Sequence, residues 1–334
     1  MSAAAPTVDT ARVNPADTVI SALRRNVWTL GLLAFLGVLL VFTRIIQPTY
    51  GPTGIQGLAN SVLPLALAAV AQAIVVIAGG IDLSIGSMMA LTSVVAATSM
   101  KDQSGEFGLL VVFGVLLLGI LLGAVNGTLV VVTRVPDIVV TLAMSFVWAG
   151  TALLVLRTPG GRTSEWLRDL VLGPFFNEWL PKAGIVLILI VAIIWIPVSR
   201  SRFGLSLYAV GSNPLAAFRS GVSVGRSKVF AYVLGGLFSA LAGLALAANT
   251  GIGTPVPGPY TLLSVAAVVL GGVSLAGGRG GVFGPIVAVV ILQLLRDDMT
   301  FLNLNTNLAT VAQGVILIVV VMLGSLLQYR RSRG

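Results

Sequence analysis

The sequence predicts an all-α integral membrane protein with about ten transmembrane helices. Of its 334 residues, 57% are hydrophobic and only 9% are charged, whereas a soluble domain averages about a quarter charged residues. Apolar runs close to the length of a membrane-spanning helix recur along the whole chain between short polar turns. Lys and Arg gather in alternate turns, as is typical of multi-pass membrane proteins. These observations exclude a soluble domain.

The first five predicted spans alternate with short polar turns. Span 28–46 has aromatic residues, Trp28 and Tyr50, at its two ends, where interfacial aromatics are common. The second span contains Pro64 and Gln72, so we expect it to be kinked and to face other helices rather than lipid. Spans two to five cover 58–78, 83–100, 108–132 and 138–156.

The second half of the chain begins with a longer polar segment, 157–182, which has both charge signs and several aromatic residues. We expect an external loop with an interfacial helix near 164–171, for which Ser164 is the N-cap and Glu165 lies in the first turn. The third and ninth spans are short and flanked by glycine, so a re-entrant course is an alternative for both. Spans six to ten cover 185–198, 229–248, 260–276, 282–295 and 307–327.

The charge distribution predicts the orientation. Ten spans place both termini on one side, and if segment 199–228 is cytoplasmic, that side has thirteen Lys and Arg against seven outside. Acidic residues number four inside and seven outside, so the whole net charge of +9 falls on the cytoplasmic side, as basic loops do. The charge therefore implies no nucleic-acid partner. We predict cytoplasmic tails at 1–27 and 329–334 around a membrane domain at 28–328, without a cleavable signal peptide.

Segment 199–228 is a polar island with five basic side chains and no acidic one. Within it, Asn213 can cap a short helix, Pro214 favours the first helical position, and Gly221 can end the helix. A short capped helix on a basic cytoplasmic loop is suited to docking another protein. The alternative is an ordinary solvated connector.

Glycine-rich breaks interrupt both halves of the chain. At 79–87, paired glycines free the backbone, and Asp82 is expected at the N-cap of the third span. Such a break either borders a solute path, because broken helices at membrane depth need protein or water around them, or is only a capped helix start, which we favour for Asp82. The stretch 249–255 is a matching break. The stretch 271–281 lacks the Lys-Ser/Thr of a phosphate-binding loop and is interpreted as a hinge-like cytoplasmic turn.

The breaks are consistent with an inverted repeat of spans two to five and seven to ten, because each set has a glycine-broken junction after its first helix. Paired interruptions in two halves indicate the transport site in repeat-built transporters. Interhelical packing is the alternative role for each polar residue in the spans. The candidates for a translocation path are Asn60, Gln72, Asp82, Ser84, Ser87, Asn126 and Asn249.

Ionisable residues are almost absent from the middle of the spans, whereas proton-coupled pumps generally need such relays. We therefore expect the energy source to lie outside this chain. The sequence has no cysteine and no histidine, which excludes disulfides, thiolate metal sites and the commonest metal ligand. We therefore expect no metal site in the chain.

Three sequence blocks together resemble the permease subunits of bacterial ribose-type monosaccharide ABC importers: GGIDLSIGSMMAL at 79–91, AVGSNPLAAFRSGV at 209–222 and LGGVSLAGGRGGVFGP at 270–285. The resemblance runs from about residue 28 to residue 328. It implies a second permease copy or paralogue, a cytoplasmic ATPase dimer that binds ATP and Mg²⁺, a periplasmic sugar-binding protein, and alternating access in the bacterial inner membrane. The resemblance also implies no catalytic residue or cofactor in this chain, because ATP hydrolysis belongs to the ATPase.

The resemblance also implies a coupling helix that fits a groove on the ATPase. Family members often have an acidic residue after the Asn-Pro pair, where this chain has Leu215, a departure that bears on the ATPase contacts. The residues that match the coupling helix are Gly211, Asn213, Pro214, Ala217, Arg219, Ser220 and Gly221.

The main functional hypothesis is therefore an ABC importer permease for a simple sugar or polyol. A permease of the same architecture for a nucleoside, an amino acid or a sugar-derived signal is the first alternative, although an amino acid would need charge partners near the path and few exist. An ion-coupled secondary transporter or channel belongs to a different class, and a scaffold without transport activity is the last alternative.

Overall fold

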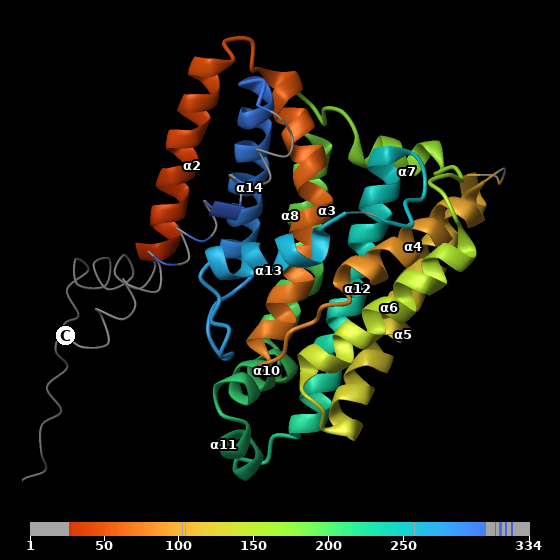
Figure 1. The fold of residues 1–334 in the computed structure, drawn as a ribbon, viewed down its shortest axis with the longest axis vertical. Helices are drawn as coiled ribbons and strands as arrows, with labels where there is room; N and C mark the ends of the chain where they lie inside the picture. The colour runs from red at the N-terminus through yellow and green to blue at the C-terminus, as the bar shows by residue number, and fades with distance from the viewer. Residues whose placement is uncertain are drawn as a thin grey trace, which may run out of the picture.

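The computed structural model describes residues 27–304, apart from 102, 104 and 257, and five single positions between 311 and 322. The residues so described form helices, turns and two isolated β-bridges, with no strand among them (Figure 1). The predicted all-α class is therefore confirmed. Apart from single positions, the tenth predicted span and both predicted tails lie outside the described residues.

Six helices in the described part of the chain are long and apolar enough to cross a membrane. They correspond to predicted spans one, two, four, five, six and seven, and the second continues through Pro64. The six are α2 (Val27–Ile46), α3 (Pro52–Ile77), α5 (Gly105–Thr133), α6 (Asp137–Val155), the helix formed by α8 (Lys182–Ile190), η1 (Val191–Trp195) and α9 (Ile196–Arg200), and α12 (Val224–Thr250).

Three further predicted spans coincide with helices, which are α4 (Ile85–Met100), α13 (Tyr260–Leu270) and α14 (Phe283–Phe301). At 1.5 Å per residue, α4 is about 24 Å long and α13 about 17 Å, both shorter than the roughly 30 Å core of a bilayer. Helix α13 stops at Leu270, before the predicted end at 276, because Gly271 and Gly272 follow and Gly272 has a φ of 80°. The total of ten spans stays a prediction.

The helix that contains the ninth predicted span is longer than expected, although it is not among the six helices apolar enough to cross a membrane. Helix α14 has 19 residues and continues to Phe301, whereas the sequence analysis ended this span at 295. The charged residues at 296–298 were assigned to an external loop, but they lie in the last turns of α14. Helix α13, in the eighth predicted span, is the shortest of these three helices.

Helices α3 and α12 form the core of the bundle. The most apolar stretch of α3 is 89% buried and that of α12 is 72% buried, whereas the values for α6 and α2 are 11% and 17%. The outer helices expose large apolar side chains such as Leu154, which is 86% exposed. These faces suit contact with lipid, because acyl chains solvate apolar side chains as well as a protein core does.

The two halves pack on each other reciprocally. Helix α3 contacts α13 and α14, and α12 contacts α4 and α5, so the first helix of each set packs on the second and third helices of the other set. Gly79 and Gly251, with φ values of 80° and 79°, follow α3 and α12 respectively. The first turns of α4 and α13 meet, since the Gly86 N–H donates to Thr261 Oγ1 at 3.0 Å. This arrangement supports the predicted inverted repeat.

Segment 199–228 is mostly helical, although the sequence analysis expected a loop around one short helix. Helix α10 (Arg202–Ser212) precedes α11 (Pro214–Arg219), and both lie at the lower end of the bundle in Figure 1. Ser201 caps α10 by accepting a hydrogen bond from the Gly204 N–H at 3.3 Å. Helix α10 was missed because its alternating polar and apolar residues were grouped with the basic ones around them.

Helix α7 (Glu165–Val171) lies at the opposite end of the bundle from α10 and α11 (Figure 1). A helix is therefore present where one was expected, and its interfacial and external position stays a prediction. Ser164 occupies the N-cap position and Glu165 the first turn, as predicted, but the Ser164 side chain makes no capping hydrogen bond.

Candidate functional site

Helix α11 forms in the way that its sequence predicts. Asn213 Oδ1 accepts a hydrogen bond from the Ala216 N–H at 3.0 Å, and Pro214 is the first helical residue. After the helix, Gly221 adopts a φ of 84°, and the Val222 N–H donates to the Ala217 carbonyl at 3.0 Å. A left-handed glycine with such a hydrogen bond is a common helix stop.

The outer surface of α11 is apolar and basic. Leu215 and Phe218 are 59% and 67% exposed, and Arg219 and Ser220 are also exposed, whereas Ala217 is buried. An exposed aromatic and an arginine on a small rigid helix are favourable features of a protein docking surface. The docking interpretation of this helix therefore has a defined surface.

Four glycines, which we call the glycine junction (Gly79, Gly211, Gly277 and Gly278), join α10 to the break after α3 and to the turn after α13. A Cβ atom added at Gly211 would overlap the carbonyl oxygen of Ile77 and lie 2.6 Å from the backbone nitrogen of Gly278. A Cβ at Gly277 would lie 2.8 Å from the Gly211 oxygen and 2.9 Å from the Gly79 Cα. The three backbones approach so closely because none of these residues has a side chain.

Hydrogen bonds hold the glycine junction together. The Gly278 N–H donates to the Ile77 carbonyl at 2.9 Å, and the Tyr208 hydroxyl of α10 donates to the Gly280 carbonyl at 3.1 Å. Burial raises the pKa of Tyr208 above its ordinary value, so the hydroxyl remains a neutral donor at physiological pH. The three sequence blocks that resemble the sugar permeases therefore meet in space.

Asp82 is fully buried in the break between α3 and α4. Its Oδ1 accepts hydrogen bonds from the Ser84 N–H at 2.8 Å and from the Ser84 hydroxyl at 2.6 Å. The predicted bond to a backbone N–H is thus present, but Asp82 is not the N-cap, because α4 begins at Ile85 and Ser84 precedes it. Aspartate commonly stabilises a turn by accepting from the residue two positions on. Asp82 Oδ2 has no hydrogen-bond partner among the residues that the structure describes.

A buried polar cluster extends from this break to α5 and α6. Asn126 Nδ2 donates to Ser84 Oγ at 2.7 Å, and Trp148 Nε1 donates to Asn126 Oδ1 at 3.2 Å. Ser87 Oγ donates to the Ser84 carbonyl at 2.8 Å. Four of the seven predicted path residues, including Asp82, therefore lie together, and Trp148 is a member that the sequence analysis missed.

The other three predicted path residues lie apart from this cluster. Asn249 Nδ2 at the end of α12 donates to the Asn60 carbonyl of α3 at 3.3 Å. Gln72 is fully buried in α3, and in the described part of the chain neither its Oε1 nor its Nε2 has a hydrogen-bond partner. None of the seven residues lines the cavity between α4 and α7 or the two cavities beside the ends of α5 and α12. Their role in a path therefore stays a prediction.

An ion pair joins α6 to α12 next to the break. Lys228 Nζ lies 3.2 Å from Asp137 Oδ1, and the Tyr232 hydroxyl donates to Asp137 Oδ2 at 3.1 Å. A Cβ at Gly80 would lie 2.5 Å from the same Oδ2. The sequence analysis counted Lys228 and Asp137 only as loop charges, since no local pattern pairs residues that are 91 positions apart.

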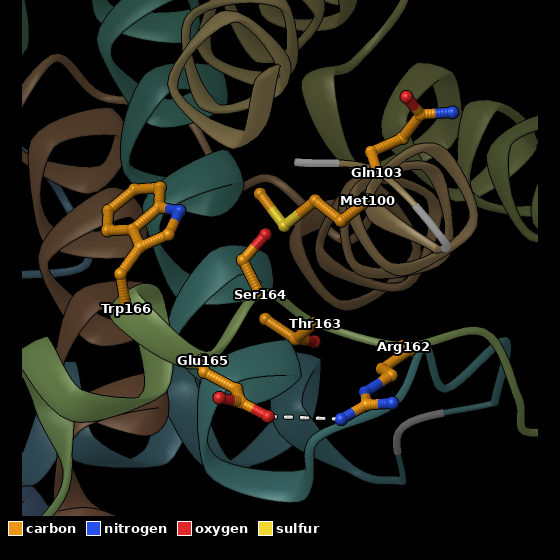
Figure 2. A pocket seen from close by; sticks show the side chains of 7 residues that line it. All are labelled: Met100, Gln103, Arg162, Thr163, Ser164, Glu165 and Trp166. Atoms are coloured by element: carbon orange, nitrogen blue, oxygen red, sulfur yellow. Dashed lines mark hydrogen bonds and ion pairs between the residues drawn. The ribbon is translucent and has the colours of Figure 1, made fainter. Parts of the chain in front are cut away.

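A cavity of about 370 Å³ lies at the opposite end of the bundle, between the end of α4 and the start of α7 (Figure 2). Arg162 and Glu165 form an ion pair of 3.1 Å in it, and Met100, Ser164 and Trp166 also line it. Because Met100 ends α4, this cavity is separated from the buried polar cluster by about the 24 Å length of that helix. In the predicted orientation, this cavity is on the external side.

Metal ligands are scarce in the part of the chain that the structure describes. No group of three acidic side chains there comes together in a way that could hold a metal ion, and the sequence supplies neither histidine nor cysteine. The expectation that ATP and Mg²⁺ bind to a partner subunit, and not to this chain, stays a prediction.

This chain is similar to a known family of permeases and to individual permeases over most of its length. The family described as branched-chain amino acid transport system / permease component matches residues 54–321. The ribose import permease protein RbsC of Bacillus subtilis is 33% identical over 304 residues, which cover 86% of this chain and 91% of that protein. The fructose import permease protein FrcC of Rhizobium meliloti is 32% identical, with 75% of this chain and 72% of that protein covered.

A third relative, the autoinducer 2 import system permease protein LsrD of Escherichia coli, is 28% identical over 91% of this chain and 94% of its own length. No solved structure matches the chain. The resemblance inferred from the three sequence blocks is confirmed by these relatives. The helical architecture, the blocks that meet at the glycine junction and the match over residues 54–321 agree: the chain belongs to the branched-chain amino acid transport system / permease component family, and is a transport component rather than an enzyme.

Proposed function

We propose that this chain is the transmembrane permease subunit of an ATP-driven ABC importer that moves a simple sugar or polyol into the cell. The observation that carries the proposal is the glycine junction, which connects the exposed helix α11, through α10, to the inner ends of α3 and α13. The relatives named for ribose and fructose import support a sugar as the solute. Six of the seven predicted path residues are neutral amides or hydroxyls, which suit a hydroxylated solute.

The proposed importer has three other components. A second permease copy or paralogue completes the membrane part, a cytoplasmic ATPase subunit binds ATP and Mg²⁺, and a periplasmic binding protein delivers the sugar. We place the assembly in the bacterial inner membrane with both termini of this chain in the cytoplasm. The exposed arginines at the α10–α11 end of the bundle support that orientation; they are Arg200, Arg202, Arg219 and Arg226.

The geometry supports a mechanism for coupling. Only Asn213 separates α10 from α11. Because this connection is a single residue, a displacement of α11 also displaces α10. Gly211 on α10 packs without a side chain against Ile77 and Gly278, so a displacement of α10 has to move the end of α3 and the turn before α14. In this proposal, ATP-driven motion of the ATPase changes the packing of the two halves through the glycine junction and so alternates access to the solute.

A second candidate is a permease of the same architecture for a nucleoside, an amino acid or a sugar-derived signal. The family description and the autoinducer 2 permease at 28% identity favour keeping this candidate. A zwitterionic amino acid would need both charge signs near the path, and Asp82 is the one charged residue among the seven predicted path residues. An ion-coupled secondary transporter has less support, because the relatives are named as import permeases of sugar systems.

Reconstitution tests the proposal. The chain is incorporated into lipid vesicles with its ATPase and its binding protein, after a screen has identified which sugars the binding protein retains. We expect uptake of the retained sugar only when ATP and the binding protein are both present on their respective sides. Uptake by the chain alone under an ion gradient would defeat the ABC importer, and a binding protein that retains amino acids but no sugar would defeat the solute class.

A further inference from the structure

Two adjoining cavities, each of about 580 Å³, form a groove along the lower ends of α5 and α12. The cavities share Val131, Ser223 and Gly225. One is bounded by α11 and the other by the start of α10. We call the two together the basic groove, and it contains none of the predicted path residues.

The deep wall of the basic groove is apolar. Val131 of α5 faces Val229, Phe230 and Val233 of α12 across one cavity. Phe203 of α10 packs on Phe230 with ring centroids 5.0 Å apart, yet it is still 61% exposed. These surfaces continue up α12 for more than two helical turns from its first residue, Val224. The wall is therefore long enough for part of an acyl chain.

The rim of the basic groove is positively charged. Arg226 lines the cavity next to α10 and Arg134 lines the cavity next to α11. Both are exposed, and neither forms an ion pair with any residue that the structure describes. Lys228 also lines the groove, but Asp137 neutralises it at 3.2 Å. No acidic residue lines either cavity. Two arginines are thus available to an anion.

The position of the basic groove selects the class of ligand. Helix α5 ends at Thr133 and α12 begins at Val224, so the groove lies where two spanning helices leave the membrane. A partner protein that docks on α11 can cover the cavity next to Pro214 and Phe218, but Val233 lies in the third turn of α12, inside the predicted span 229–248. Basic pockets between helices at the cytoplasmic side of membranes bind the headgroups of anionic lipids.

We propose that the basic groove binds an anionic phospholipid, whose phosphate is held by Arg134 and Arg226 while an acyl chain lies against Val131 and Phe230. The lipid joins the lower end of α5 to α10 and α12 next to the coupling helix. This lipid site does not depend on which solute is transported. A test of lipid binding is therefore separate from a test of the proposed sugar import.

Native mass spectrometry of the purified, delipidated chain tests the proposal. The protein is titrated with dioleoyl phosphatidylglycerol or with dioleoyl phosphatidylcholine. We expect one phosphatidylglycerol to bind preferentially, and Arg134→Gln with Arg226→Gln to weaken its binding by about 30-fold, the effect of two cationic side chains near an anionic headgroup. Arg157→Gln is the matched control, because Arg157 is also an exposed arginine just after a spanning helix, at the other end of the bundle.

A second variant tests the apolar wall. Val131→Phe fills the region shared by both cavities and leaves the arginines in place, so it should also lower phosphatidylglycerol binding, and circular dichroism checks that the helices are retained. Equal binding of the two lipids, an equal loss in Arg157→Gln, or displacement of the lipid by free glycerol phosphate would overturn the proposal. Loss of the lipid when the ATPase is bound would assign the groove to that protein instead.

Discussion

Substitution of Gly211 by alanine is expected to uncouple ATP hydrolysis from transport. The added methyl group would overlap the Ile77 carbonyl oxygen and approach the Gly278 nitrogen to 2.6 Å. Both are backbone atoms, so they cannot rotate away as a flexible side chain would. Helix α10 therefore has to move off the ends of α3 and the 271–282 turn, and the hydrogen bond from Gly278 to Ile77 lengthens.

The size of the effect follows from the packing. One extra methylene in a filled site costs about 1–3 kcal/mol, and the loss of a backbone hydrogen bond costs about 1 kcal/mol. Partial relaxation reduces that sum to about 2 kcal/mol. We call the junction closed when α10 packs on the end of α3 and open when the two are apart, and this free energy shifts the equilibrium toward the open junction about 30-fold. If transport requires the closed junction, and the closed and open junctions are close in free energy because the cycle alternates between them, ATP-driven uptake should fall by at least about tenfold, whereas ATP hydrolysis should continue.

The assay compares uptake and ATP hydrolysis in the same vesicles. Gly150→Ala is the matched control, because a Cβ at this position of α6 would meet nothing within 4 Å. It should leave the number of ATP molecules hydrolysed per sugar unchanged, whereas Gly211→Ala should raise that number about tenfold or more. Normal uptake with an unchanged ratio in Gly211→Ala would refute the idea that the glycine junction transmits force.

Three other predictions follow from the same geometry. Arg219→Glu together with Pro214→Ala should uncouple the ATPase while membrane insertion stays normal; unchanged copurification with the ATPase and normal uptake would count against the docking surface of α11. Lys228→Met should lower the free energy of unfolding in detergent by about 1–3 kcal/mol, because it leaves the half-buried Asp137 carboxylate without its cation. Adding Asp137→Asn should recover part of that loss, and a further loss in the double variant would contradict the pairing. Ser220→Cys introduces a single cysteine, because the chain has none of its own. This cysteine should react with an impermeant maleimide in inside-out vesicles and not in intact cells. Labelling in intact cells would show that the orientation is the opposite of the proposed one.

The spans that the sequence predicted well are those in which a long apolar run settles the structure locally. Helices α2, α5 and α6 agree with their predicted bounds to within a few residues. The errors fall where glycine or amphipathic patterns compete with hydrophobicity. Helix α13 stops six residues early because two glycines follow it, and α10 was missed because one of its faces is buried by the bundle rather than by lipid.

The candidate site was predicted unevenly for a related reason. The cap and stop of α11 depend on neighbours in the chain, so Asn213, Pro214 and Gly221 were assigned correctly from sequence. Asp82 accepts a hydrogen bond from Ser84, and Ser84 accepts one from Asn126 on α5. From the sequence, these three could be proposed only as separate polar residues. Nothing in the sequence indicated that they form one cluster, because hydrogen bonds between helices have no local signature.

The sequence by itself determined that this chain is a helical membrane protein and which three blocks carry the family resemblance, and it is the basis of the proposed orientation. These properties depend on composition, on charge between spans and on residues that are neighbours along the chain. Only the tertiary structure decided that Gly79, Gly211 and Gly278 meet, that Lys228 pairs with Asp137, and that two arginines border an apolar groove. Such contacts depend on how α3 and α12 exchange partners between the two halves, and that packing joins residues far apart in sequence.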